Sequence, residues 1–347
     1  MVKNEHSLDG QPVSDELVLS TDLQEGVVLL ASAGLYTIQL QSPSGEQGSV
    51  VKCSLRGNLK KSLTYSTSSS QPRRVTRAKR PRTTDSVAVG DRVRIVTSDD
   101  KVGMIEEVLP RRSKFSRLGF RGQEQTIVSN LDQLVIVFAC AEPNPDYWMI
   151  DKWLIAAEIY GLKVLLIANK CDLVDEVALN AILGEYSHSG YQMIATSVRN
   201  GTGVEELRGL LKNTISAFTG PSGVGKSSLL NSLQPGLQLA VGAIGQTTWK
   251  GKHTTTARSL IPLESGGWVA DTPGLRQLEL PPMTREEIIS CFPDFLNVLQ
   301  VSCRFQNCRH DMEPDCQLKL AVKNKLVNER RYKNYLEIAR SMEDPRH

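Results

Sequence analysis

The sequence has 347 residues, of which 40% are apolar and 23% are charged, a composition typical of a globular protein and not of a disordered or fibrous chain. The formal net charge is only +3, so any role that depends on basicity requires basic residues to be clustered. Seven cysteines in a chain of this length exclude a small disulfide scaffold, and the longest apolar runs, at 134–141 and 164–168, are too short to cross a bilayer. We expect a soluble protein of two or three domains in a reducing compartment, with no membrane partner.

The first residues carry several acidic side chains, which organellar transit peptides lack: Glu5, Asp9, Asp15, Glu16 and Asp22. We interpret residues 1–20 as a flexible tail. The expected location is the cytoplasm, and the chloroplast stroma or the mitochondrial matrix is the alternative if the chain is of organellar origin.

Five short strand-like segments follow the tail, each bounded by Gly, Ser or Asp turn signals. They are 27–30, 35–40, 50–55, 93–96 and 101–108. Because no helical periodicity separates them, they predict a β-barrel of the OB-fold type over residues 21–117, although any small all-β domain would show the same strand count.

Two basic clusters accompany this predicted barrel. The insertion at 66–84 contains Arg73, Arg74, Arg77, Lys79, Arg80 and Arg82. Its low apolar content favours either a solvated linker or an arm that binds the phosphates of a nucleic acid. The second cluster comprises Arg111, Arg112, Lys114, Arg117 and Arg121. Together the two clusters favour an RNA partner.

From residue 118 to 283 the pattern changes to apolar strands that alternate with helices. The expected strands are 134–140, 164–168, 192–195, 215–219 and 268–270, and the expected helices include 150–160, 204–212 and 227–233. This alternation predicts an α/β domain with a parallel sheet and helices on both faces. Ligand-binding loops are then expected at the carboxyl ends of the strands.

The last part, residues 284–347, combines helices with a cluster of cysteine and histidine. We expect one amphipathic helix from Leu318 to Met342 that packs through its apolar side chains. The basic residues predicted on its exposed side are Lys319, Lys323, Lys325, Arg330, Arg331 and Lys333.

A glycine-rich segment between an apolar strand and a helix matches the phosphate-loop pattern without deviation. It comprises Gly220, Pro221, Ser222, Gly223, Val224, Gly225, Lys226 and Ser227, and Ser228 follows it. Backbone amides of such a turn converge on phosphate oxygens, so the segment predicts a nucleoside triphosphate site. Lys226 is expected at the outer phosphates, and the Ser227 hydroxyl is expected to bind Mg²⁺.

Three further segments complete a predicted GTP site. Asp271, with Gly274 three residues later, ends a strand where a carboxylate can bind the metal and a glycine amide the last phosphate. The Asn169-Lys170-Cys-Asp172 segment places a carboxylate where it can accept two hydrogen bonds from guanine, a donor pair that adenine lacks. Thr196 and Ser197 lie where a loop closing on the base is expected, although Val198 departs from the usual Ser-Ala pair.

These motifs occur in an unusual order. In an ordinary GTPase the phosphate loop comes first, whereas here Asn169 and Ser197 precede Gly220 and Asp271 comes last. A circular permutation preserves the site, because only the meeting of the loops in space matters. Between the phosphate loop and Asp271, the segment Lys252–Thr256 offers a magnesium-binding threonine, and we favour Thr255 with Thr254 and Thr256 as near equals.

The cysteine and histidine cluster has the spacing of a metal site. Cys303, Cys308, His310 and Cys316 offer three thiolates and one imidazole, a tetrahedral set that predicts one structural Zn²⁺ with no open position. The other four cysteines lie outside this spacing and are interpreted as ordinary thiols.

From about Gly26 to the end, the chain closely resembles the RsgA (YjeQ) family of ribosome-assembly GTPases. The resemblance rests on the permuted motifs, the preceding barrel and the Cys/His cluster, with further matches at Val89–Val93, Asp151–Leu154 and Lys252–Thr256. It implies a GTPase that binds the small ribosomal subunit and its rRNA, acts in late assembly and leaves after hydrolysis. It also implies that His253 positions the attacking water, since the residue after Gly274 is a leucine, and that Lys226 and Thr255 complete the catalytic set.

We expect a monomer. Two other classes of function remain as alternatives: an RNA-binding chaperone with a vestigial nucleotide site, and a signalling GTPase that responds to a protein.

Overall fold

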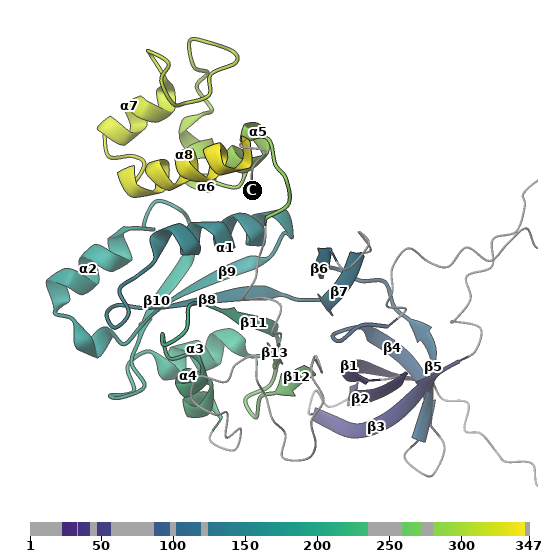
Figure 1. Cartoon of the computed structure of the whole chain (residues 1–347). Helices are drawn as coiled ribbons and strands as arrows, with labels where there is room; N and C mark the ends of the chain where they lie inside the picture. Colours follow the sequence, from purple (N-terminus) through teal and green to yellow (C-terminus); the bar gives the residue numbers. More distant parts are fainter. Residues whose placement is uncertain are drawn as a thin grey trace, which may run out of the picture.

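The computed structural model describes residues 23–32, 34–41, 47–56, 87–97, 102–118, 124–234, 259–271 and 280–343. Figure 1 shows a barrel, a central sheet flanked by helices, and a further group of helices beside the central part. The tail expected at 1–20 and the basic insertion at 66–84 lie outside the described residues. Within the described ranges, no helix is long and apolar enough to cross a membrane.

The N-terminal part is a closed five-stranded barrel. Its strands are β1 (Gln24–Ser32), β2 (Leu35–Gln41), β3 (Gln47–Leu55), β4 (Arg92–Thr97) and β5 (Val102–Val108). They follow the order β1-β2-β3-β5-β4, and pairing of β4 with β1 closes the barrel. Ile38, Ile95 and Ile105 are completely buried, since alternate residues of each strand face the interior. The predicted barrel is confirmed.

The central part is a mostly parallel sheet with helices on both faces. Its strands are β8 (Gln133–Ala139), β9 (Lys163–Asn169), β10 (Gln192–Thr196), β11 (Ile215–Thr219), β12 (Ser259–Pro262) and β13 (Trp268–Asp271), and its helices are α1 (Tyr147–Ile159), α2 (Glu176–Gly184), α3 (Val204–Leu211) and α4 (Lys226–Leu233). Along β8, Ile136 packs in one hydrophobic cluster with α1, and Val137 packs in another with α3 and α4. The strand therefore reads as a continuous apolar run in the sequence.

Four elements were not predicted from the sequence. Strands β6 (Lys114–Leu118) and β7 (Glu124–Ser129) form a separate antiparallel hairpin between the barrel and β8. Helix α2 and the four-residue strand β12 complete the set. Strand β12 pairs with β13 on one side and with β1 on the other, so that the barrel and the central sheet form one continuous sheet (Figure 1).

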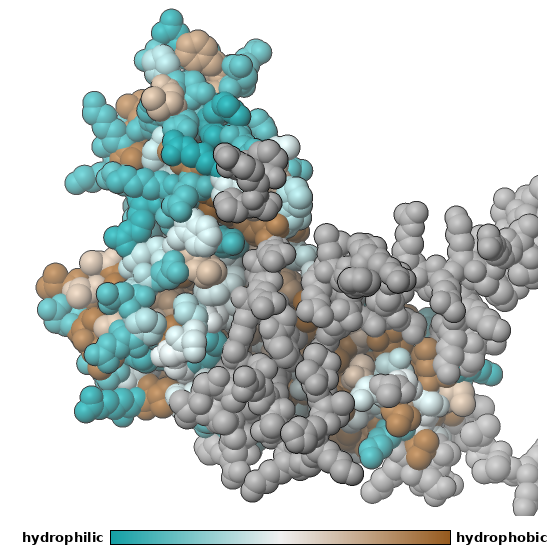
Figure 2. Space-filling model, in the orientation of Figure 1, coloured by the Kyte–Doolittle hydropathy of each residue, from teal (hydrophilic) through white to brown (hydrophobic). Residues whose placement is uncertain are grey.

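The C-terminal part contains α5 (Arg285–Ser290), α6 (Pro293–Val298), α7 (Gln317–Lys323) and α8 (Glu329–Glu343). The single helix expected from Leu318 to Met342 is wrong: the chain leaves the helix at Asn324, and Lys325 adopts a left-handed conformation with φ of 60°. The break allows α7 and α8 to bury Leu318 and Ile338 in one cluster with Phe295. In the view of Figure 2, the surface of this part is mostly hydrophilic.

Candidate functional site

The phosphate loop lies between β11 and α4, where the geometry requires glycine. Gly220 and Gly225 adopt φ values of 144° and 92°. A Cβ atom on Gly220 would lie 2.0 Å from the carbonyl oxygen of Val137, and one on Gly225 would lie 2.4 Å from Nδ2 of Asn169. Both contacts are far shorter than atoms allow, so the glycines let the loop pass close to its neighbours.

The first residues of α4 face this loop. Lys226 and Ser227 are only 6% and 4% exposed. The Lys226 ammonium donates to the carbonyl oxygens of Gly220 at 2.7 Å and Pro221 at 2.5 Å. The loop is therefore closed around a positive charge at a helix N-terminus, an arrangement suited to an anionic ligand.

Asn169 joins the end of β9 to both neighbouring segments. Its Nδ2 donates to the carbonyl oxygen of Val224 in the phosphate loop at 2.7 Å. Its Oδ1 accepts from the Thr196 hydroxyl, at the end of β10, at 2.9 Å. Asn169 and Thr196 are 2% and 0% exposed. This buried network therefore fixes the ends of β9 and β10 and the phosphate loop relative to one another. The next residue, Lys170, donates through Nζ to the Glu142 carbonyl oxygen.

Asp172 lies beside the loop that follows β10. The Ser197 hydroxyl donates to Oδ1 of Asp172 at 2.6 Å, and Arg199 approaches Oδ2 at 3.9 Å. The Asp172 side chain keeps 15% exposure, whereas Ser197 is completely buried. A buried hydroxyl thus holds a partly exposed carboxylate beside the loop that follows β10, and this carboxylate has an acceptor oxygen available for a ligand.

The remaining predicted nucleotide residues are described only in part. The backbone of Asp271 ends β13, one residue beyond Ala270, which pairs with Ala217 of β11. The strand therefore delivers Asp271 to the same edge of the sheet as Gly220. The side chain of Asp271, together with Gly274, His253 and Thr255, lies outside the described residues.

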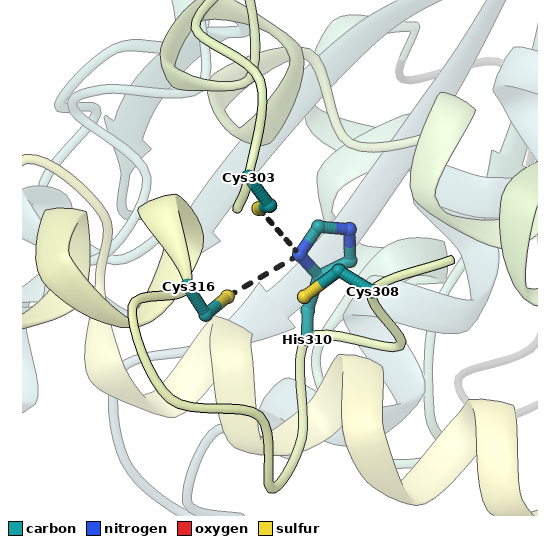
Figure 3. Close-up of side chains that lie close together, drawn as sticks. All are labelled: Cys303, Cys308, His310 and Cys316. Atoms are coloured by element: carbon teal, nitrogen blue, oxygen red, sulfur yellow. Dashed lines mark hydrogen bonds between the residues drawn. The ribbon is translucent and has the colours of Figure 1, made fainter. Parts of the chain in front are cut away.

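The cysteine and histidine cluster is brought together as the spacing predicts (Figure 3). One ligand atom from each of Cys303, Cys308, His310 and Cys316 lies within 4.8 Å of the others. The His310 Nδ1 atom is 3.6 Å from Cys303 Sγ and 3.3 Å from Cys316 Sγ. Tetrahedral zinc, with its usual bond lengths to sulfur and nitrogen, requires S···N separations of about 3.6 Å. The donor set fits that ion.

Burial also shifts the pKa values of the cluster. Burial raises the pKa of Cys308 to about 12 and raises that of Cys316, while it lowers the pKa of His310. Thiols in this environment remain protonated unless a cation replaces the protons. Helix α8 supports the loop from behind, because the Tyr332 hydroxyl donates to the His310 carbonyl oxygen at 2.8 Å.

A buried charge cluster that sequence reasoning missed joins the central and C-terminal parts. Arg331 of α8 was expected on an exposed surface, yet it is only 2% exposed. It donates to Asp294 of α6 at 2.9 and 3.0 Å and to Asp151 of α1. Asn334 donates to the second oxygen of Asp151 at 2.6 Å. Burial raises the pKa of Asp151 to about 6, although Arg331 and Asn334 oppose the shift.

One arginine of the basic cluster after the barrel is used inside the protein, whereas its neighbour is largely exposed. Arg111 makes a two-pronged ion pair with the fully buried Asp91, at 2.7 and 2.8 Å, and Arg112 pairs with Asp132 at 3.3 Å. Arg111 is therefore engaged by Asp91, and the role of the cluster as a whole in RNA binding stays a prediction. The Val89–Val93 segment, one of the stretches that resemble the RsgA family, includes Gly90. A Cβ atom on Gly90 would lie 2.1 Å from the Ser129 carbonyl oxygen, so glycine allows the barrel to contact the β6–β7 hairpin closely there.

Comparison with known proteins agrees with this geometry. The sequence model of the RsgA GTPase family matches residues 108–281. A "Small ribosomal subunit biogenesis GTPase RsgA" of Gemmatimonas aurantiaca is 37% identical over 317 residues, which cover 90% of this chain and 95% of that protein. One of Azotobacter vinelandii is 38% identical over 326 residues, which cover 93% of this chain and 87% of that protein.

Two solved structures share the architecture. The crystal structure of YjeQ from Thermotoga maritima superposes with a TM-score of 0.71 at 32% identity, covering 93% of this chain and 100% of that one. The structure of YloQ, described as a circularly permuted GTPase, gives a TM-score of 0.69 at 26% identity, covering 94% and 98%. The predicted permuted fold and the predicted enzyme class, a GTP hydrolase, are thus confirmed. The chain belongs to the RsgA GTPase family.

Proposed function

We propose that this enzyme binds the small ribosomal subunit through its rRNA, acts late in the maturation of that subunit, and is released when it hydrolyses GTP to GDP and phosphate. The observation that carries the proposal is the bond from Asn169 to the Val224 carbonyl oxygen, which ties the guanine-reading segment to the phosphate loop. The names of the relatives, small ribosomal subunit biogenesis GTPases, point to the partner. We place the reaction in the cytoplasm, with the enzyme as a monomer.

Each site residue has a proposed task. Asp172, held by Ser197, accepts hydrogen bonds from guanine, and a base without that donor pair would leave the carboxylate unpaired. Lys226 exchanges its two carbonyl partners for the outer phosphates of GTP. Ser227, Thr255 and Asp271 are the proposed Mg²⁺ ligands, and bound Mg²⁺ neutralises charge on the transferring phosphoryl group. His253 is proposed to orient the water, and Gly274 to donate its amide to the last phosphate.

The metal site of the C-terminal part and the domain boundaries are also proposals. We propose that Cys303, Cys308, His310 and Cys316 hold one structural Zn²⁺, because their distances and their burial suit that ion. The division of the chain at residues 20, 117 and 283 stays a prediction.

The deciding experiment measures GTP turnover with and without purified small ribosomal subunits. Alone, the enzyme should turn over at about 10⁻⁴ to 10⁻² s⁻¹, as unassisted GTPases do, and subunits should accelerate it. Lys226→Ala should abolish both rates, because it removes the charge at the phosphates. Turnover that ignores small subunits, or that survives Lys226→Ala, would contradict the proposal.

A further inference from the structure

The strand that delivers Asp271 to the nucleotide site is separated from the barrel by only one short strand. Ser259, the first residue of β12, pairs with Asp271 of β13 on one side and with Leu30 of β1 on the other. The three Cα atoms thus form one row across three hydrogen-bonded strands. At the spacing of neighbouring strands, the barrel begins about 10 Å from the backbone of Asp271.

A side-chain hydrogen bond reinforces this junction. The indole Nε1 of Trp268, the first residue of β13, donates to Oε1 of Gln39 in β2 at 2.8 Å. Gln39 is only 4% exposed, although it points out of the barrel strand toward the central part. Trp268 also pairs with Ile215 at the start of β11, the strand that leads into the phosphate loop. The bond therefore joins the barrel to two neighbouring strands of the nucleotide site.

The apolar packing is continuous across the same junction. Leu29 of β1 lies in one buried cluster with Leu260 of β12 and Ala270 of β13, and these residues are 7%, 3% and 3% exposed. On its other edge β1 pairs with β4 from Gln24 to Val27 and with β12 at Leu30, and its register against β2 shifts between Val28 and Leu30. Because packed interiors transmit displacement, the barrel cannot shift without β12 and β13.

We propose that Gln39 and Trp268 are a positioning pair: the barrel holds β13, and with it the backbone of Asp271, in place beside the phosphate loop. A small subunit bound to the barrel then stimulates hydrolysis through this contact. The inference rests on the proposed function, since it requires Asp271 to serve the reaction and the barrel to bind the subunit.

The test uses Gln39→Leu, Trp268→Phe and the double variant in the full chain. Each single variant removes one partner of the bond and should lower the subunit-stimulated kcat about threefold to tenfold, with the KM for GTP unchanged. The double variant should lose no more than the stronger single variant, because both remove the same contact. Gln41→Leu is the matched control: it changes an exposed glutamine of the same strand and should match the wild type.

Hydrogen exchange of residues 259–271 in the GDP-bound form supplies a readout independent of turnover. Exchange should accelerate in Gln39→Leu and Trp268→Phe and stay unchanged in Gln41→Leu. The inference would be overturned if both variants kept the wild-type exchange rate and the wild-type stimulation by small subunits. It would also be overturned if exchange became faster while stimulation stayed complete, because the hydrogen bond would then serve only the structure. A wild-type enzyme that hydrolyses no GTP, or ignores small subunits, would instead refute the proposed function and the inference together.

Discussion

Ser197 shows how much of the nucleotide site depends on single buried hydroxyls. Its side chain is completely buried and makes one short bond to Asp172, the carboxylate proposed to read guanine. In the absence of that bond the carboxylate is free to turn away from the base. If Asp172 reads the base as proposed, its orientation is set by a residue that need not touch the base itself.

We expect Ser197→Ala to weaken GDP binding about fivefold, the consequence of losing one hydrogen bond of about 1 kcal/mol. Calorimetric titration with GDP measures the change. Ser187→Ala is the control, because that hydroxyl also donates one hydrogen bond, to the carbonyl oxygen of Gly184, but lies on an exposed turn. Equal affinities for the Ser197→Ala variant and the wild type would show that Asp172 needs no support.

Helix α8 lies within a stretch predicted to be helical, but its buried charge was not predicted. The apolar periodicity identified every strand of the barrel and of the parallel sheet except β12, because burial of a strand face leaves a pattern that is local in the sequence. The burial of Arg331 leaves no such pattern. Its partners Asp294 and Asp151 lie 37 and 180 residues away, so only the fold brings the three charges together.

The nucleotide and metal motifs were predictable for a related reason. The phosphate loop, the Asn169–Asp172 segment and the Cys/His cluster each carry their chemistry within a few consecutive residues. The contact between Gln39 and Trp268 joins residues 229 positions apart and could not be predicted from either neighbourhood. The β6–β7 hairpin was missed because its strands contain few apolar residues. Helix α2 was missed although six of its nine residues are apolar and Asp175 caps its first turn.

The charge cluster on α8 predicts a dependence of stability on pH. Two carboxylates share one guanidinium in the interior, and burial raises the pKa of Asp151 to about 6 from its ordinary value near 3.8. The folded state therefore binds the extra proton more tightly than the unfolded state does. The stability that this group contributes is present at low pH and is lost as the pH rises through about 6.

Asp151→Asn removes this titration. Urea unfolding at pH 5 and pH 7 should show that the wild type loses more stability over that interval than the variant does, by at least about 1 kcal/mol. The variant is expected to be less stable at both values, because the amide cannot accept from Arg331 and Asn334 together. Asp315→Asn, which alters an exposed ion pair with Arg304, should leave the pH dependence unchanged. Parallel curves for Asp151→Asn and the wild type would exclude this origin.

Metal removal should act on the C-terminal elements alone. A strong chelator, or Cys303→Ser, is expected to release one zinc ion per chain and to abolish protection from hydrogen exchange in residues 303–316. Binding of a structural zinc ion contributes about 10–16 kcal/mol to the folding free energy, and the other contacts of so short a loop cannot supply that amount. Cys291→Ser, a buried thiol outside the cluster, should retain the metal. Full protection without zinc would show that the helices alone hold the loop.

At the scale of the whole molecule, α8 connects the cysteine and histidine cluster with the GTPase part. On one side Tyr332 and Arg340 bind the loop that carries His310, through the His310 carbonyl oxygen and the Asp311 carboxylate. On the other side Arg331 binds Asp151 of α1. Helix α8 therefore contacts both α1 and the loop of the Cys/His cluster, and we expect a displacement of α1 to reach the cluster through it.

We expect the nucleotide state to alter hydrogen exchange in residues 303–342. Exchange is compared between the GDP form and a form with a non-hydrolysable GTP analogue, because we expect loss of the last phosphate to change contacts of the nucleotide site that reach α8 through α1. Lys226→Ala under the same conditions is the control and should show no difference. Identical exchange in the two wild-type forms would contradict the coupling.

The way α1 is shared between two cores limits how this protein can be divided. Its Trp153 and Leu154 pack on the sheet, while Ile155 and Ala156 belong to the cluster of the C-terminal helices. Removal of everything after residue 283 would expose the apolar side chains of Ile155 and Ala156 to water and would leave the Asp151 carboxylate without Arg331 and Asn334. A shortened or transplanted GTPase part will therefore have to include α6 and α8, or the face of α1 that packs against them will have to be redesigned.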